Sequence, residues 1–376
     1  MRTQRLKSID IFRGACMAWM VLTHLLDWWL KPEFSWLQTA AIMIIDPIGA
    51  SGFLFISGVS LTISHRNRLK RARGSEDYTY NMVRNSYFFR VLFIFIVAII
   101  YNIPTAIALG PAMIWTWYVL LTAAVSIFLA WPLLKISKLF RILTAILILV
   151  IHFSIVSWLL GFQGETNFLG LVFHILYNDI HQDPILVFFP FFIIGTVFGD
   201  LISENVYRDE TNQQYSIFYK KLLVPVLTIG SLMITTGILI YFPNFLIRES
   251  LSWVIYSMGI DLCLLSILLV IEKNNILETK RSYKLIFYYS YYSLTIYLAH
   301  NLLYFLFLDQ LDYITIWFFA IPSFFILGLL LRWIYKNFRE KASLKVQIGR
   351  LSQTVAHKIE VRKLRQISNI YYEREN

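Results

Sequence analysis

Three ionisable side chains lie inside the first apolar stretch of the chain, and their types suit chemistry on a small polar substrate. The stretch RLKSIDIFRGACMAWMVLTH, residues 5–24, contains Asp10, Arg13 and His24. A neutral histidine can take a proton from a hydroxyl or an amine, or attack a reactive carbonyl itself. An arginine can bind phosphate groups. Both kinds of group need a helix that holds them toward a common cavity.

Helical geometry places these groups on one side of such a helix. Arg13 and His24 are 11 residues apart, which at ~100° per residue gives nearly the same face at a separation of roughly 16 Å. Asp10 lies one turn before Arg13 on that side. Ionisable groups in membrane helices almost always face the bundle interior. The alternative is that Asp10 and Arg13 neutralise each other at the interface while His24 is a hydrogen-bonded core group.

The composition defines the class of protein. Hydrophobic residues make up 57% of the chain and charged residues only 15%, and the mean hydropathy is +0.60. Such a chain is too apolar for a soluble domain and indicates an integral membrane protein. Its net charge of +11 lies between apolar segments and not on one soluble face, so we expect no nucleic-acid partner. Cys16 and Cys263 lack metal-type spacing; we expect small core residues and no metal.

Segments of about 20 apolar residues, long enough to cross a bilayer, recur along the chain. Of the 34 Lys and Arg residues, 30 fall on one side if both termini are cytoplasmic, and the outer loops hold only Lys31 and Arg248. The sequence therefore predicts an all-α polytopic protein of the cell membrane with about ten transmembrane helices and cytoplasmic termini. The expected spans are 9–30, 38–64, 86–108, 112–134, 140–161, 183–203, 221–242, 250–272, 284–307 and 313–335.

Two further segments have an amphipathic pattern. The outer loop 162–182 contains LGLVFHILY, too short to span, and we expect a helix on the outer membrane surface. Residues 1–335 form the predicted membrane domain, and residues 336–376 a basic cytoplasmic tail. In the tail, apolar residues recur at helical spacing, which indicates an amphipathic helix on anionic lipid or on a partner; the alternative is a solvated tail. These residues are Leu344, Ile348, Leu351, Val355 and Ile359.

The second span contains helix-breaking residues. In IIDPIGASGFLFISGVS, Asp46 precedes Pro47 and several glycines and serines follow. Proline and small residues break or thin a membrane helix where it lines a cavity or packs closely on a neighbour. Close packing explains the glycines but not Asp46. We expect Asp46 or a serine such as Ser57 to orient a catalytic histidine.

Three more ionisable residues are candidate binding groups. Arg90 lies at the start of 86–108, where it either meets substrate phosphates or extends to the membrane interface. Asp261 and His300 lie inside predicted spans and have no basic neighbour in sequence. An intramembrane ionisable residue is a site candidate by default, although hydrogen bonding within the bundle is an alternative for both.

Several of these motifs resemble the transmembrane acyltransferase superfamily. Arg13, ten residues and then His24 resemble the Arg/Lys-x10-His motif of acyltransferase-3 proteins, and GFLFISGVSLTIS at 52–64 resembles their phenylalanine-rich segment. The segments IDIFRG, DPIGASGFLFISGVSL and YYSLTIYLAHNLLY are similar to prokaryotic relatives of heparan-α-glucosaminide N-acetyltransferase, as is PFFIIGTVFGD at 190–200.

The resemblance implies transfer of an acyl group, usually acetyl, from a cytoplasmic acyl-CoA to a hydroxyl or amine, often of a sugar, on the far side of the membrane. His24 would be catalytic and Arg13 would bind or orient the donor, with Asp10 and Asp46 beside them. Acetyl-CoA or another acyl-CoA is the implied donor, and the implied partners are a sugar or glycan acceptor and the lipid bilayer. The oligomeric state stays open. One departure is visible: heparan-type enzymes carry their active histidine in the loop after helix 1, where this chain has KPEFSW with Glu33.

Two other interpretations use the same residues. A proton-coupled transporter also buries Asp, Arg and His, but inverted-repeat carriers break helices at corresponding positions of two halves. Here the polar features concentrate in spans 1 and 2, which favours the enzyme. An inactive family member that serves as an anchor or sensor is the third interpretation, and the presence of both Arg13 and His24 weighs against it.

Overall fold

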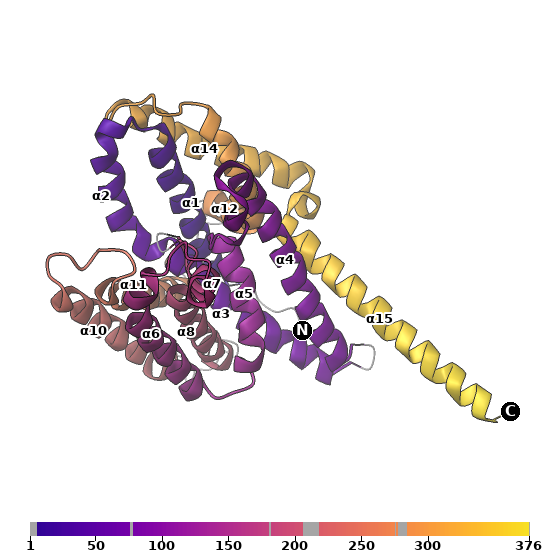
Figure 1. The fold of residues 1–376 in the computed structure, drawn as a ribbon. Coiled ribbons are helices and arrows are strands. Elements are labelled where there is room, and N and C mark those ends of the chain that lie inside the picture. Colours follow the sequence, from indigo (N-terminus) through magenta and orange to yellow (C-terminus); the bar gives the residue numbers. More distant parts are fainter. Residues whose placement is uncertain are drawn as a thin grey trace.

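The fold is a bundle of apolar helices (Figure 1). The computed structural model describes residues 6–75, 78–179, 182–205, 218–274, 276 and 284–375. Within these residues, eight helices are long and apolar enough to cross a membrane. The prediction of an all-α polytopic membrane protein is confirmed.

Eight of the ten predicted spans correspond to these helices. Their bounds are α1 Lys7–Trp29, α2 Ser35–Ile45 with α3 Ala50–Arg73, α4 Tyr80–Leu109, α6 Lys138–Leu160, α8 Ile185–Asn205, α10 Val224–Ile240 preceded by η4 Tyr219–Leu223, α11 Leu251–Lys273 and α14 Thr315–Asn337. The break predicted at Pro47 is confirmed, because the short 3-10 turn η2, Asp46–Ile48, separates α2 from α3.

The two remaining predicted spans are not continuous membrane-length helices. Segment 112–134 becomes η3, Pro111–Trp115, and α5, Val119–Leu133, whose 15 residues extend only about 22 Å. The segment before α5 is held against α7, Phe168–Leu176, because Trp115 and Trp117 both donate Nε1–H to the Ile175 carbonyl oxygen, at 3.0 and 3.1 Å. Segment 284–307 breaks into α12 Lys284–Tyr291, α13 Ser293–Ala299 and η5 His300–Phe305.

Polar contacts sort the helix ends into two faces of the bundle. At one face the first residues of α1 meet the end of α11, where the backbone N–H of Ser8 donates to Glu272 at 2.8 Å. There too Lys138, at the start of α6, pairs with Glu204 near the end of α8 at 2.5 Å. The start of α1 therefore meets the end of α11, and the start of α6 meets the end of α8, as neighbours at one face of the predicted topology would.

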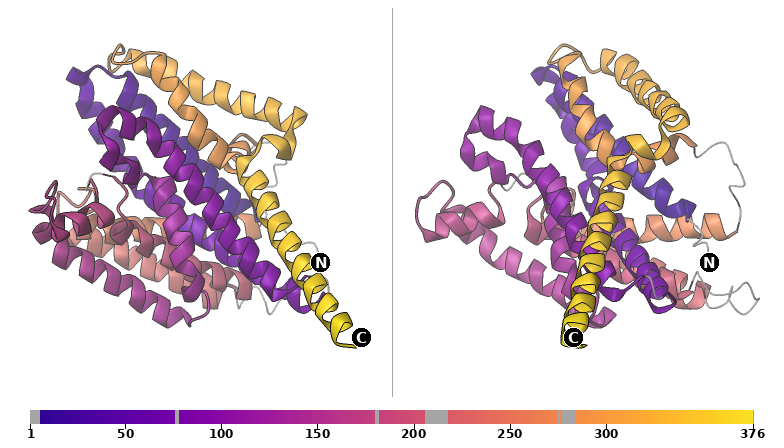
Figure 2. Two further views of the ribbon diagram at one scale, coloured as in Figure 1. Left: turned by 45° about the vertical axis from the view of Figure 1, so that its right-hand side comes forward. Right: turned by 90° about the vertical axis from the view of Figure 1, so that its right-hand side faces the viewer.

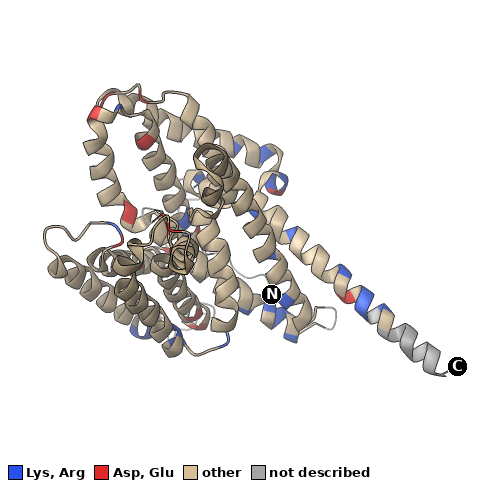
Figure 3. Cartoon of the chain, viewed as in Figure 1, with Lys and Arg blue, Asp and Glu red and all other residues tan. Residues whose placement is uncertain are grey.

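Basic residues mark this same face. Lys and Arg gather near the N-terminal end of the chain and along α15 (Figure 3). Five of the Lys and Arg residues that the predicted topology assigns to the cytoplasmic side lie outside the described residues: Arg2, Arg5, Arg208, Lys280 and Arg281. The assignment of this face to the cytoplasm stays a prediction.

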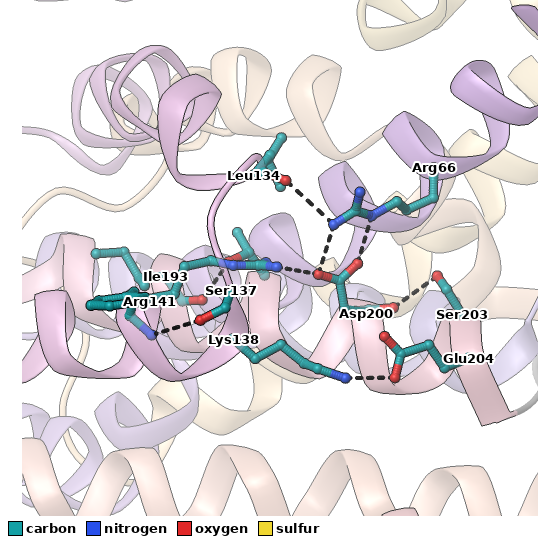
Figure 4. A network of polar contacts seen from close by, with 12 residues as sticks. Arg66, Leu134, Ser137, Lys138, Arg141, Ile193, Asp200, Ser203 and Glu204 are labelled. Carbon is teal, nitrogen blue, oxygen red and sulfur yellow. Dashed lines mark hydrogen bonds and ion pairs between the residues drawn. The ribbon is translucent and has the colours of Figure 1, made fainter.

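A single buried carboxylate ties three helices together near the predicted cytoplasmic face. Asp200 of α8 accepts hydrogen bonds from Arg66 of α3, at 2.8 Å, and from Arg141 of α6 (Figure 4). Arg141 is 1% exposed and also donates to Thr196 at 3.2 Å. Because a charge buried without a partner is strongly destabilising, this network fixes α3, α6 and α8 in one register.

The helices α3 and α8 lie in backbone contact. A Cβ added at Gly58 would overlap the Phe192 carbonyl oxygen, and one added at Gly195 would overlap the Phe55 carbonyl oxygen. At Gly199 an added Cβ would lie 2.7 Å from the Val59 carbonyl oxygen. Small residues allow membrane helices to approach this closely. Gly58 of the first glycine-containing motif and Gly195 and Gly199 of the second therefore serve this helix pair.

The outer amphipathic segment forms the predicted helix. It is α7, Phe168–Leu176, and its residues Phe168, Leu171 and Ile175 are exposed on one side. These residues are 0, 3 and 7 positions along the helix, so they share a face that suits a membrane surface.

The predicted helix of the tail is confirmed, and the face that packs on the bundle is not the apolar stripe predicted to meet lipid or a partner. The helix α15, Leu344–Glu375, runs alongside α4 and extends beyond the bundle (Figure 2). Its buried residues are Ser352, Ala356 and Glu360, and Glu360 accepts a hydrogen bond from Thr79 at the start of α4, at 3.1 Å. Small side chains allow the close approach, whereas Leu351 of the predicted apolar stripe is 50% exposed.

The contact of α3 with α8 gives a stability prediction. Gly195→Ala forces a methyl group into the backbone of α3, and overpacking typically costs 1–3 kcal/mol, so we expect unfolding of the detergent-solubilised protein at a clearly lower temperature (estimate of about 2 kcal/mol). Gly349→Ala is the control, since nothing lies within 4 Å of an added Cβ there. Equal unfolding temperatures for both variants would contradict the close contact.

Candidate active site

The rings of His24 and His300 lie next to each other, although the two residues come from opposite ends of the chain. Their ring centroids are 5.0 Å apart with an interplanar angle of 43°. The indole of Trp28 stacks on both rings, at 5.1 Å from His24 and 5.5 Å from His300. His300 is buried and His24 is half-buried. The structure thus brings together two of the residues that the sequence singled out.

The tautomer of His300 follows from its hydrogen bonds. Its Nδ1 lies 2.7 Å from the Tyr297 carbonyl oxygen and 3.2 Å from that of Ile296. Carbonyl oxygens only accept, so Nδ1 carries the proton and donates. The lone pair is then on Nε2, which is buried and has no hydrogen-bond partner in the described part of the chain. A neutral His300 therefore offers an unused acceptor beside His24.

Backbone contacts at the outer end of α1 hold the two histidines in place. The Trp29 indole donates to the Leu303 carbonyl oxygen at 2.8 Å, and the Leu311 N–H donates to the Trp29 carbonyl oxygen at 2.8 Å. Asn301 donates to the hydroxyl of Tyr101 on α4 at 2.9 Å. The break in segment 284–307 is what lets η5 turn across α1 and present His300.

Arginines gather at the other end of the same helix face. Arg13 donates to Ser60 of α3, and Arg68 donates to Ser86 of α4 at 3.0 Å. Arg90 lies within electrostatic range of both Arg13 and Arg68, and its Nε has no hydrogen-bond partner among the described residues. Arg90 therefore faces the interior of the bundle and not the interface. Clustered guanidinium groups suit a ligand that carries phosphates.

The other predicted site residues take separate places. Asp10 is buried and accepts a hydrogen bond from Ser290 of α12 at 3.1 Å. Ser57 is half-buried on α3, and the serine that contacts Arg13 is Ser60, nearly one turn further on. Asp261 is fully buried on α11.

Asp46 meets an arginine that sequence reasoning did not assign to a site. The Arg248 Nε lies 3.0 Å from the Asp46 carboxylate, and Arg248 also donates to Asp183 at 2.5 Å. This contact joins η2 to the loop before α8 and the loop before α11. The group beside the His24 ring is His300, whereas the sequence favoured Asp46 or Ser57. The sequence feature that could have identified Arg248 as a site residue is its position, because it is one of only two basic residues in the predicted outer loops.

The cluster around Arg248 contains more acids than bases. Burial raises the pKa of Asp183 to about 6, although the positive charge of Arg248 lowers it. Burial raises the pKa of Glu249 to about 8, and the charges of Asp183 and Asp46 raise it too, against the lowering effect of Arg248. A cavity of about 280 Å³ opens beside the cluster, with Gln38, Asp46 and Arg248 among its lining residues. Its volume is near the lower end of those that hold small ligands.

Within the described residues, no group of three or more His, Cys, Asp or Glu side chains is arranged to hold a metal ion. The arrangement that is present consists of a histidine pair at the C-terminal end of α1, an arginine cluster at its N-terminal end, and a separate cavity lined by Asp46 and Arg248. Such a set suits proton transfer on a substrate that carries phosphates, inside a polytopic membrane protein.

Comparison with known proteins identifies the family. The family model described as "Heparan-alpha-glucosaminide N-acetyltransferase, catalytic" matches residues 5–242, more than half of the chain. The chain belongs to this family, which is one of acetyltransferases. No curated protein matches the chain. The matched region contains His24, Arg13, Asp46 and Arg90 but ends before Arg248 and His300.

The raised pKa values predict how stability changes with pH. Folded Glu249 holds its proton up to about pH 8, whereas unfolded glutamate releases it near its ordinary value, so its contribution to stability is lost as pH rises through this window. Asp183 acts in the same direction up to about pH 6. We expect Glu249→Gln to flatten the fall in unfolding temperature between pH 5 and 9 and to be more stable than the wild type above pH 8.

The control for this prediction is Glu33→Gln, which changes an exposed glutamate in the turn after α1. Thermal unfolding in detergent, followed across the pH series, gives the comparison. Parallel curves for the wild type and Glu249→Gln would contradict the assignment of a proton to Glu249.

Proposed function

We propose that the protein transfers an acyl group, acetyl in the first instance, from a cytoplasmic acyl-CoA to a hydroxyl or an amine of a sugar at the outer face of the cell membrane. The observation that carries the proposal is the approach of the His24 and His300 rings, whose centroids lie 5.0 Å apart, with the Nε2 acceptor of His300 left without a hydrogen-bond partner among the described residues. Membership of an acetyltransferase family supports it.

The donor site in this proposal is the arginine cluster. Arg13, Arg68 and Arg90 bind the phosphates of coenzyme A, and the arm of the donor runs along α1 toward His24. From Arg13 to His24 the helix rises roughly 16 Å. The arm is peptide-like, and at about 3.5 Å for every three chain atoms it extends roughly 15 Å. The thioester therefore reaches the histidine pair when the phosphates sit on the arginines.

The histidine pair supplies the proton transfers. In the proposed reaction, a rotation of the two adjacent rings brings the N–H of His24 to the unpartnered Nε2 of His300 and leaves the other ring nitrogen of His24 free to take the proton of the acceptor hydroxyl or amine. The acceptor oxygen or nitrogen forms a bond to the acyl carbon, the carbon–sulfur bond breaks, and the proton passes to the leaving thiolate. The same pair also suits a two-step route in which His24 carries the acyl group before the acceptor arrives.

Loss of the base tests the proposal directly. With acetyl-CoA as the donor, a hexosamine as the acceptor and purified protein in detergent, we expect His24→Ala to lower thiol release by about 100-fold or more. His357→Ala, which changes an exposed histidine of α15, is the control and keeps the wild-type rate. Equal rates for wild type and His24→Ala would contradict the proposed role.

A truncated donor tests the arginine cluster. Arg90→Gln removes a guanidinium group aimed at the donor phosphates, so we expect KM for acetyl-CoA to rise about tenfold. KM for acetyl-pantetheine, which lacks the nucleotide and its phosphates, stays the same. Arg84→Gln, at an exposed position of the same helix, is the matched control. An equal rise with both donors would show that Arg90 acts on the fold.

A further inference from the structure

Asp261 is a carboxyl group buried in the bundle without a partner. It lies midway along α11, is 0% exposed, and neither of its oxygens has a hydrogen-bond partner in the described chain. Asp200 and Asp46, by contrast, pair with arginines. A carboxyl group isolated in this way destabilises the fold unless something else meets it. The proposed acyl transfer between the arginine cluster and the histidine pair assigns no role to Asp261.

The neighbours of Asp261 place it beside α1, between the two ends of the proposed site. An added Cβ at Gly52 of α3 would lie 2.9 Å from Asp261 Oδ1, 3.3 Å from Cys16 Sγ and 3.3 Å from the ring of Phe12. The charges of Asp261 and Arg13 both act on the Cys16 thiol. Cys16 is nearly one turn past Arg13 and about two turns before His24. Asp261 therefore lies at a level that the donor arm must pass.

The side chains between Arg13 and His24 can make room for such an arm. Met17 and Met20 fill the α1 face at this level; Met17 is 2% exposed and Met20 is half-buried. Methionine is unbranched and changes rotamer readily, so it fits itself around an inserted chain. Glycine at position 52 leaves the Asp261 carboxyl open toward α1, where any larger residue would collide with it.

We propose that Asp261 binds the amide groups of the donor arm. The arm of coenzyme A carries two amide N–H groups and a hydroxyl, and these donors lose their water when they enter the bundle. The two unused oxygens of Asp261 accept their hydrogen bonds, so donor and carboxyl satisfy each other in a place where neither has another partner. This inference rests on the proposed function and assigns specificity for an amide-containing acyl carrier to one residue.

Binding of two ligands without turnover tests the inference. The probes are coenzyme A and 3′-phosphoadenosine 5′-diphosphate, which has the phosphates but no arm, each titrated calorimetrically into the purified full chain. We expect Asp261→Leu to weaken coenzyme A about tenfold or more and to leave the affinity for the nucleotide unchanged. Leucine has a similar size and removes an isolated buried carboxyl, so the unfolding temperature stays the same or rises.

Two variants serve as controls. Ser266→Ala changes another buried polar group of α11 that lacks a partner but points about 140° away from Asp261, and we expect no change in either affinity. Asp261→Asn keeps one acceptor oxygen and gives an intermediate loss, so the test still stands if the leucine variant does not fold.

The outcomes separate this inference from the proposed function. If the wild type binds neither probe, both the acyl-CoA site and the role of Asp261 are wrong. If the wild type binds coenzyme A and Asp261→Leu binds it equally well, or loses both probes to the same extent, the proposed function stands and the inference about Asp261 is overturned.

Discussion

The structure depends on the constraint that a charge inside a membrane bundle needs a partner. Most of the buried ionisable groups satisfy it within the protein: Asp200 holds two arginines, and Arg248 holds Asp46 and Asp183. Because an unpaired charge is so unfavourable in this environment, the groups left without partners stand out. Among the described residues, the unpartnered atoms that lie around α1 are His300 Nε2 near its C-terminal end, Arg90 Nε near its N-terminal end and both oxygens of Asp261 between them.

The unpaired groups are held in place by a closely packed part of the bundle. Backbone contact between α3 and α8 through Gly58 and Gly195, together with the Asp200 network, fixes the helix that carries Ser60 and Gly52. Against this support, α1 presents its polar face. The outer ends are held differently, by backbone hydrogen bonds from the end of α1 to the segment after η5 and by the Arg248 cluster. The proposed donor site thus rests on packed helices, whereas the proposed acceptor side rests on loops and short turns.

Much of the fold could be predicted from the sequence because hydrophobic length and basic residues follow simple rules. Those rules located all ten segments and the break at Pro47, but they do not describe partial spans. Segment 284–307 is apolar enough to span, yet it turns at Tyr292, and only this break puts His300 beside His24. The tail helix was predicted from an apolar stripe expected to meet lipid or a partner, whereas the face of α15 that packs in the structure carries the small residues Ser352 and Ala356. Both histidines were named as candidates, but no local pattern pairs residues so far apart in the chain. Arg248 carried a signal as an arginine in an outer loop, and its two carboxylate partners are visible only in three dimensions.

The central claim is that one site along α1 joins a donor at one membrane face to an acceptor at the other. The most direct measurement uses sealed proteoliposomes of known orientation, with acetyl-labelled acetyl-CoA on the side of the N-terminus and a hexosamine on the opposite side. We expect labelled acetyl-hexosamine on the acceptor side and free coenzyme A on the donor side. Label transferred only when donor and acceptor share one side, or no transfer in either arrangement, would contradict it.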